Sequence, residues 1–237
     1  YDVVCAMGGD GTVNEVINGI AGTGAALAVI PVGTGNDFAS ALGVPKGDVA
    51  AACRILARGH RRPMDLCRVN DRFFASSFGA GFDARVTKAA NERFKRLGGI
   101  WTYIFAVMSV IWSFRPGPMR IVADGRKISK SPLLVAVTNW KSYGGGMYIC
   151  PDAEIDDGLF EVCIVDSFPI LRFLYSFPRV IRGTHVTMPE VEIFRARSVH
   201  ISCSRMETYH VDGEVFEADD MQLVLVPAGI DVVVGEV

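Results

Sequence analysis

The sequence lacks the patterns that mark secreted, zinc-binding and nucleic-acid-binding proteins. Its six cysteines form no C-x-x-C pair and most lie in apolar runs, so they indicate buried free thiols, not a zinc site or a disulfide framework. No basic stretch with a cleavage site opens the chain, as it would in a signal peptide, and we expect a cytoplasmic location. With 24 Lys and Arg against 26 Asp and Glu, the net charge of −2 shows no basic excess for nucleic acid.

Long uncharged runs are also scarce. Leu97–Phe114 is the one that stands out, and its 18 residues reach only the lower limit for a membrane span. Polar side chains such as Thr102 and Ser109 argue against spanning, so we expect a core helix or a helix beside an apolar cleft. The basic residues before it suit either an anionic membrane surface or a solvated helix face. They are Lys88, Arg93, Lys95 and Arg96.

What the chain has in quantity is apolar material. Half of its residues are hydrophobic, which excludes global disorder. Its 237 residues suffice for one large domain or two small ones, at about 100–200 residues each. Residue 1 is Tyr, and Tyr1–Met7 already has the apolar pattern of a buried strand. We therefore expect the chain to begin inside a domain.

The N-terminal part alternates strands with helices. Strands over 1–7 and 26–31 each lead through a Gly-rich turn to a helix, the pattern of an α/β domain. After Pro63, ten short strands predict a β-sandwich-like domain, interrupted by helical stretches over about 84–114 and 170–182. We place the two domains at 1–62 and 63–237. The last four predicted strands cover 198–203, 209–211, 222–226 and 230–234.

Two glycine-rich turns carry the chemical signal. Gly8–Thr12 lies between a strand and a helix, where backbone N–H groups and the helix N-terminus can cradle a phosphate. It matches neither a Walker A loop nor G-x-G-x-x-G, and taken alone it serves equally well as a capped turn. Gly33–Asp37 follows the next strand in the same way, so in a parallel sheet both turns meet at one edge. The pair predicts a phosphate-binding crevice.

These motifs resemble a known family. Gly8–Val16 followed by Pro31–Ala39 is similar to the paired motif of the diacylglycerol kinase-type catalytic domain, close to the soluble bacterial lipid kinases. Pro151–Leu159 and Val211–Glu214 resemble two downstream segments of the same family, so the resemblance extends over almost the whole chain. It implies a truncated Rossmann-like α/β nucleotide-binding domain followed by a β-sandwich-like domain with inserted helices.

The resemblance also implies roles for individual residues. One of the acids Asp212 and Glu214 is expected to be the base that takes the proton of a lipid hydroxyl, whereas without the glycine loops they would indicate a solvated hairpin turn. Asp10 is the expected partner of nucleotide-bound Mg²⁺ and is counted with the catalytic acids. The residues expected to bind ATP are Gly8, Gly9, Asp10, Gly11, Thr12, Asn14, Thr34 and Asn36.

A separate metal site is expected in an acidic loop. The resemblance implies a structural or regulatory divalent ion held by Glu154, Asp157 and the carbonyl of Leu159. The Asp-Asp-Gly sequence there would form a polar β-turn equally well.

Together these features predict an ATP-dependent lipid kinase that converts diacylglycerol to phosphatidic acid, with transient contact at the inner membrane surface and homodimerisation left open. The first alternative is another lipid alcohol as acceptor, a sphingoid base or ceramide, although sphingosine-type relatives carry Ser-Gly where this chain has Gly8-Gly9. The second is a catalytically inactive nucleotide- or lipid-binding fragment, because the family's N-terminal Asn-Pro-x-x-Gly strand is not in this sequence.

Overall fold

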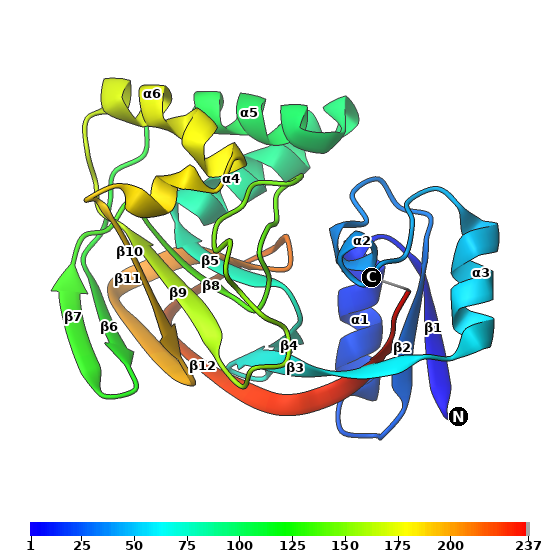
Figure 1. The fold of residues 1–237 in the computed structure, drawn as a ribbon. Helices are drawn as coiled ribbons and strands as arrows, with labels where there is room; N and C mark the ends of the chain where they lie inside the picture. Colours follow the sequence, from blue (N-terminus) through cyan, green and yellow to red (C-terminus); the bar gives the residue numbers. More distant parts are fainter. Residues whose placement is uncertain (236–237) are drawn as a thin grey trace.

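Two long antiparallel strands, β3 (Arg61–Val69) and β12 (Glu214–Val233), connect the two lobes of the molecule (Figure 1). The computed structural model describes residues 1–235. The smaller lobe contains β1 (Val3–Gly8), α1 (Asp10–Ile20), β2 (Ala26–Pro31), α2 (Asp37–Ala41) and α3 (Val49–Arg58).

Strand β2 lies at the centre of the small lobe. All six of its residues are buried, because β1 pairs with it in parallel on one side and β12 on the other, through Val232 and Leu27. The prediction that residues 1–7 form a buried strand was wrong in one respect. In the structure β1 is an edge strand, so Ala6 is buried while Cys5 and Met7 are exposed.

The larger lobe is built on antiparallel strands. The main sheet runs β1-β2-β12-β11-β5-β8-β9-β10, with β3/β4 and β6/β7 attached at its sides. Its central strand β11 contacts β12, β5 and β6, and a cluster that includes Phe74, Phe78, Phe160 and Ile201 fills the interior with fully buried side chains. The remaining strands are β4 (Arg72–Phe74), β5 (Ser77–Gly81), β6 (Met119–Ala123), β7 (Arg126–Lys130), β8 (Leu134–Thr138), β9 (Phe160–Val165), β10 (Val191–Ala196) and β11 (Ser198–Val211).

A helical layer covers this lobe, with α5 (Gly99–Val110) and α6 (Ile170–Ile181) outermost and α4 (Phe82–Ala89) beneath them (Figure 1). The helix predicted over 84–114 is broken. A π-helical turn (Ala90–Phe94) and a 3₁₀ turn (Lys95–Leu97) follow α4, and Gly98 and Gly99 both have positive φ, which ends one helix before α5 begins. A further 3₁₀ turn, Thr184–Thr187, follows α6. Within residues 1–235, no helix is long and apolar enough to cross a membrane.

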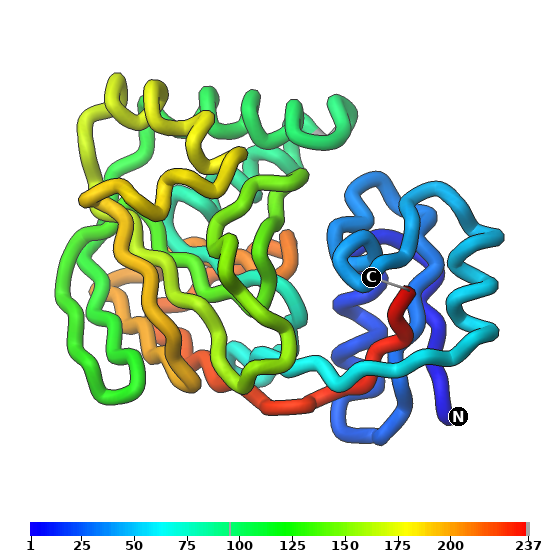
Figure 2. Tube along the Cα trace, in the orientation of Figure 1, coloured from blue at the N-terminus to red at the C-terminus, as the bar shows by residue number. Residues whose placement is uncertain are grey.

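The last part of the chain differs from the sequence prediction. The four predicted strands after residue 198 are two long ones, β11 and β12, whose pairing continues on both sides of an irregularity between Ser202 and Glu207, opposite Asp219. After an irregularity between Val226 and Ile230, β12 leaves the large lobe and enters the small one (Figure 2). The C-terminal strand therefore completes the small lobe, and β3, which contains Pro63, runs beside it.

Candidate active site

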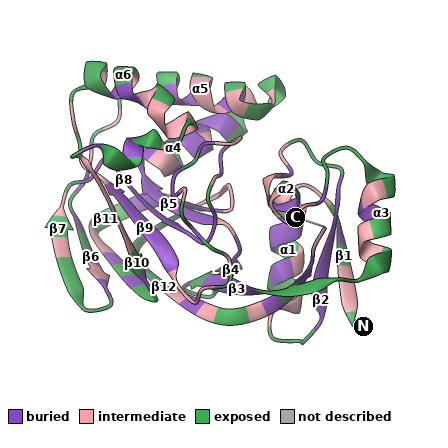
Figure 3. Ribbon diagram, viewed as in Figure 1, coloured by how far each residue is buried: buried purple, intermediate pink, exposed green. Residues whose placement is uncertain are grey.

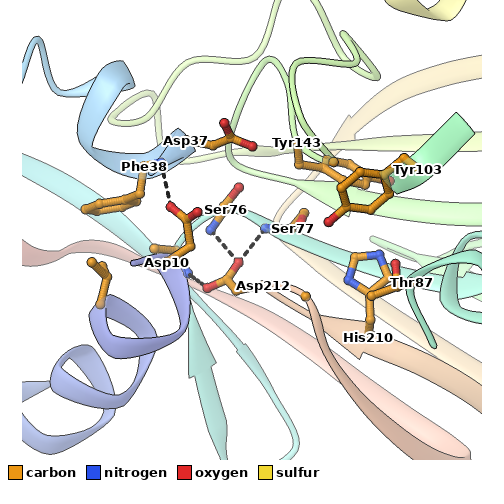
Figure 4. A pocket seen from close by; sticks show the side chains of 14 residues that line it. Asp10, Asp37, Phe38, Ser76, Ser77, Thr87, Tyr103, Tyr143, His210 and Asp212 are labelled. Atoms are coloured by element: carbon orange, nitrogen blue, oxygen red, sulfur yellow. Dashed lines mark hydrogen bonds between the residues drawn. The ribbon is translucent and has the colours of Figure 1, made fainter. Parts of the chain in front are cut away.

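A pocket of about 80 Å³ lies where the two lobes face each other (Figure 4). The small lobe contributes Asp10, Asp37 and Phe38, and the large lobe contributes Tyr143 and Asp212, among others. The sequence predicted Asp10 and Asp212 as site residues from opposite ends of the chain, and the structure brings both to this pocket.

The first glycine turn leads directly into α1. Gly9 is the N-cap residue, and the N–H of Val13 bonds to the Gly9 carbonyl at 3.1 Å. The backbone N–H groups of the first helical turn have no partner within the helix, which makes this end suited to an anion. A Cβ added at Gly8 would lie 2.4 Å from Thr12 Oγ1, so glycine at this position makes room for the Thr12 side chain.

The second glycine turn rests on the first. Asn36 has φ +53° and folds back onto Gly33, accepting the Gly33 N–H at 3.0 Å and donating to its carbonyl at 2.7 Å. A Cβ at Gly33 would lie 2.4 Å from Gly9 Cα, so the two backbones can meet only with glycine at position 33. The predicted ligand Asn36 thus uses its side chain to shape the loop, while Thr34 beside it is exposed.

Two carboxylates of the small lobe face the pocket. Asp10 Oδ1 accepts the Phe38 N–H at 3.0 Å, and Asp37 accepts bonds from Lys46 Nζ at 3.0 Å and from the Gly145 N–H at 3.2 Å. Burial raises the pKa of Asp10, the Phe38 N–H opposes this, and the negative charges of Asp37 and Asp212 add to the increase. This accumulation of negative charge favours a cation.

Asp212 is held by four N–H donors. Its Oδ1 accepts the backbone N–H groups of Ser76 and Ser77 at 3.0 and 2.8 Å, and its Oδ2 accepts that of Ala75 at 3.0 Å and Asn14 Nδ2 at 2.8 Å. It occupies the β11–β12 hairpin turn with Gly213, and both have positive φ (+46° and +88°), the conformation that favours Asp-Gly. The predicted hairpin is therefore present, but its aspartate is fixed in the pocket (Figure 4).

The other predicted acid of this turn has a different environment. Glu214 forms an ion pair with Arg72, whose guanidinium also lies 4.9 Å from the centre of the Phe216 ring. Glu214 does not line the pocket, whereas Asp212 does. The predicted ligand Asn14 is buried at 1% exposure and contacts Asp212, so the structure assigns its side chain to the lobe interface.

Sequence reasoning missed a buried polar cluster on the large-lobe side of the pocket. Asp83 Oδ2 accepts a hydrogen bond from the Tyr143 hydroxyl at 2.6 Å and contacts His210 Nε2 at 2.9 Å. A Cβ at Gly79 would lie 2.2 Å from Asp83 Oδ2, so the cluster depends on glycine at this position. The sequence offered one signal for this cluster, because Asp83 lies in the first turn of a helix that directly follows a strand. Its partner His210 is 127 residues away along the chain and has no such signal.

Tyrosine hydroxyls line the same side. Burial raises the pKa of Tyr103 to about 12, with the charges of Asp37, Asp83 and Asp10 adding to the effect, and burial also raises the pKa of Tyr143. Both hydroxyls therefore stay protonated and remain donors beside the carboxylates.

The donor set fits a nucleotide-bound divalent ion better than a stand-alone metal site. Mg²⁺ commonly takes one or two protein carboxylates together with substrate phosphates, and Asp10 and Asp37 provide that number. Across residues 1–235, no group of three or more His, Cys, Asp or Glu side chains is gathered closely enough to hold a metal ion.

The acidic loop remains a predicted metal site. Asp157 accepts the backbone N–H of Leu159 at 3.0 Å and lies 3.6 Å from Arg195, while the neighbouring Asp156 forms an ion pair with Arg62 at 2.8 Å. Glu154 lines a separate cavity together with Arg62.

A second cavity, about 80 Å³ and mainly apolar, lies between the helical layer and the sheet of the large lobe. Val107, Phe173 and Phe177 line it from above, and Cys163 and Val165 from β9. Asp83 also lines this cavity, and its partner Tyr143 lines the polar pocket, so one hydrogen bond links the walls of the two cavities.

Comparison with known proteins agrees with this geometry. Residues 1–69 match the diacylglycerol kinase catalytic domain family, and residues 76–234 match the YegS C-terminal NAD kinase beta sandwich-like domain family. The predicted combination of an α/β domain and a β-sandwich-like domain with helices is confirmed.

Individual relatives are similar over most of the chain. Diacylglycerol kinase from Mycobacterium tuberculosis is 35% identical over 98% of this chain and 76% of its own length. Diacylglycerol kinase from Bacillus subtilis is 33% identical over 90% of this chain and 71% of its own length. A crystal structure from Bacillus anthracis strain Sterne, assigned to the diacylglycerol kinases, has a TM-score of 0.83 and 28% identity, covering 99% of this chain and 78% of that one. The chain therefore belongs to the diacylglycerol kinase family and is a lipid kinase.

Proposed function

We propose that the protein transfers the γ-phosphoryl group of ATP to the free hydroxyl of diacylglycerol and releases phosphatidic acid and ADP. The observation that carries the proposal is the hydrogen bond between Asn14 and Asp212, which fixes the phosphate-binding end of α1 and an acceptor-side carboxylate around one pocket. Relatives at 33–35% identity that are named diacylglycerol kinase support the same acceptor.

The small lobe binds the nucleotide in this proposal. Backbone N–H groups at Gly8–Thr12 contact its phosphates, with Thr34 at the neighbouring turn. Magnesium-bound ATP supplies the phosphoryl group with part of its charge neutralised. Asp10 and Asp37 hold the ion, and their mutual repulsion and burial make the site favourable for a cation.

Asp212 orients the acceptor hydroxyl and takes its proton. Phosphoryl transfer depends more on positioning than on covalent chemistry by the protein. A carboxylate fixed by four N–H donors meets that need, and Asp212 is the acid of the hairpin turn that lines the pocket. Glu214 supports the turn through its ion pair with Arg72.

Part of one acyl chain of the acceptor enters the apolar cavity, whose volume of about 80 Å³ is too small for two whole chains. The wall of this cavity meets that of the polar pocket at the Tyr143–Asp83 bond, so a lipid can place its hydroxyl near Asp212 while the beginning of a chain lies beneath α5 and α6. A lipid acceptor of this kind brings the enzyme to the inner membrane surface for each turnover. Such contact is peripheral and transient.

A screen of lipid acceptors with radiolabelled ATP and Mg²⁺ tests the proposal. The panel contains diacylglycerol, a sphingoid base and ceramide in mixed micelles, and the product is separated by thin-layer chromatography. We expect phosphatidic acid as the main labelled product. Preferential labelling of a sphingoid base or ceramide would show that this lipid, and not diacylglycerol, is the acceptor. ATP binding without labelling of any lipid would identify a nucleotide-binding protein without kinase activity.

A further inference from the structure

The outer face of α5 exposes a continuous stripe of large apolar side chains. Trp101, Phe105 and Met108 lie in α5 and Trp112 in the turn that follows it, and their spacings of four, three and four residues place them on one side of this helical stretch. They are between 43% and 60% exposed, and the opposite side of the helix, with Ala106 and Val107, is buried. Exposed apolar surface of this extent marks an interaction site.

Helix α6 continues the same feature. Leu171 and Tyr175, one turn apart, are 79% and 86% exposed, while Phe173 between them is buried. Phe173 belongs to the same apolar cluster as Ala106 and Val107, so both helices turn their buried faces to one cluster and their exposed faces outward. Figure 3 shows exposed residues along the outer sides of both helices. We call this surface of Trp101, Phe105, Met108, Trp112, Leu171 and Tyr175 the helical platform.

Within the two chain segments that form the helical platform the charged side chains have one sign, and Glu92, Asp166 and Glu190 flank these segments. Residues 93–115 and 167–189, which contain the two helices, include no Asp or Glu, although the whole chain has 26. Arg93, Arg96 and Arg115 are exposed at the two ends of the α5 stripe. Seven basic residues lie in the two segments: Arg93, Lys95, Arg96, Arg115, Arg172, Arg179 and Arg182. Arg172 forms an ion pair with Glu190, just outside the second segment.

We propose that the helical platform is the surface by which this enzyme docks on an anionic lipid bilayer, an inference that rests on the proposed lipid acceptor. Tryptophan and tyrosine favour the boundary between headgroups and acyl chains, and arginines beside them contact lipid phosphates. Helix α5 has 12 residues, so it lies along the interface and does not span the membrane.

A second copy of the chain fits this surface less well. A two-fold symmetric dimer would place the same patch against itself and bring basic side chains together without acidic partners from the two segments. A bilayer containing phosphatidylglycerol provides the complementary charge. The same two helices supply Val107, Phe173 and Phe177 to the apolar cavity, so a docked enzyme holds this cavity next to the lipid whose chain enters it.

Vesicle flotation tests the docking surface without any turnover. The purified protein is mixed, without ATP, with phosphatidylcholine vesicles that contain either no or 30% phosphatidylglycerol (about one-third, to give a strong anionic surface). We expect binding to the anionic vesicles, weakened by added salt, and at least tenfold weaker binding by a Trp101→Ala/Trp112→Ala variant. Met206→Ala, which shortens an exposed apolar side chain on β11, is the matched control and binds like the wild type.

Two further measurements distinguish a loss of docking from a loss of kinase activity and from unfolding of the variant. Thermal melting confirms that the double variant is folded, and both proteins phosphorylate a monomeric short-chain diacylglycerol equally well. Unchanged vesicle binding by the double variant overturns the proposal, as does a dimer, detected by light scattering, that the variant disrupts while the wild type fails to bind vesicles. Platform-dependent vesicle binding without phosphorylation of any lipid would leave docking established and refute the proposed kinase acceptor instead.

Discussion

Asn14 Nδ2 donates a 2.8 Å hydrogen bond to Asp212 Oδ2 across 198 residues of sequence. It joins the first helix of the small lobe to a hairpin turn of the large lobe, and it completes the set of four donors around the carboxylate. The two motifs at the ends of the chain thus form one structural unit.

Removing the Asn14–Asp212 bond should lower kcat by more than the accompanying loss of folding stability explains. We expect Asn14→Ala to lose about 1–3 kcal/mol of stability, because buried polar partners lose their bond, and to lower kcat at least tenfold as Asp212 gains freedom. Steady-state kinetics and urea unfolding measure the two effects.

Asn18→Ala is the matched control. Asn18 lies one turn along the same helix and bonds to the backbone of Phe73 in the large lobe at 2.8 and 2.9 Å, and it contacts Asn14 Oδ1 at 3.2 Å but not Asp212. Because Asn18 is exposed, this variant should lose less stability than Asn14→Ala and retain its kcat. Equal losses of kcat in both variants would show that lobe contact in general, and not the position of Asp212, controls turnover.

Gly11→Ala tests where the phosphates bind. A Cβ at Gly11 meets no protein atom within 4 Å, so the variant should fold with unchanged or slightly higher stability. If nucleotide phosphates approach this turn, its ATP affinity should fall at least tenfold. Gly19→Ala in the same helix, where the added Cβ also meets no atom within 4 Å, should bind ATP like the wild type. Isothermal titration calorimetry compares them, and equal affinities would move the phosphate site elsewhere.

The pKa of Asp10 leads to a pH-dependent prediction. Because burial and the neighbouring acids raise this pKa in the folded state, the folded protein holds the proton more tightly than the unfolded chain does. The resulting stabilisation is fully present below the ordinary carboxyl pKa of about 4 and is lost as pH rises through the raised pKa.

Asp10→Asn should therefore melt at a higher temperature than the wild type at pH 7, and the difference should vanish near pH 4. The amide oxygen can still accept the Phe38 N–H. Magnesium-bound ATP should stabilise the wild type, by about 2.7 kcal/mol at one hundred times its dissociation constant, and stabilise the variant much less. A lower melting temperature for the variant at pH 7 would contradict the unfavourable effect of burial and of the neighbouring acids on the charged form of Asp10.

Ser176→Phe tests the apolar cavity. Ser176 is buried in α6 and lines this cavity, so a phenylalanine there occupies space assigned to an acyl chain. We expect kcat/KM for a long-chain diacylglycerol to fall at least tenfold while a short-chain one is used as well as before. Ser176→Ala should alter neither value. A uniform loss for both chain lengths would indicate damage to the fold, which thermal melting detects.

Local patterns predicted much of this molecule. The strand, glycine turn and helix sequence around Gly8–Thr12 depends on near neighbours, so its elements and its place at the sheet edge follow from the sequence. Resemblance of the two glycine motifs identified the family and the role of Asp10, and resemblance of Val211–Glu214 identified Asp212 together with Glu214. The Asp-Gly hairpin at Asp212 was likewise visible from turn chemistry.

Long-range contacts were beyond prediction. The prediction divided β12 at residues 227–229, which are turn-forming, and left the acid-rich residues 214–221 outside the strands, yet pairing with β11 and β3 keeps all of them in one strand. The Asp83–His210 pair and the Asn14–Asp212 bond join residues 127 and 198 positions apart, and no local pattern encodes such partners. Asn36 was expected to bind the nucleotide, but its bonds to Gly33 depend on a left-handed backbone that the sequence does not show.

The most direct test of the account compares Asp212→Asn with Glu214→Gln in single-turnover phosphorylation of diacylglycerol, with ATP affinity measured in parallel. We expect Asp212→Asn to slow phosphoryl transfer by about 10²–10⁴-fold with ATP affinity nearly unchanged, and Glu214→Gln to slow it less than tenfold. Wild-type turnover by Asp212→Asn, or a larger loss from Glu214→Gln, would contradict the assignment of Asp212 as the carboxylate that receives the acceptor proton.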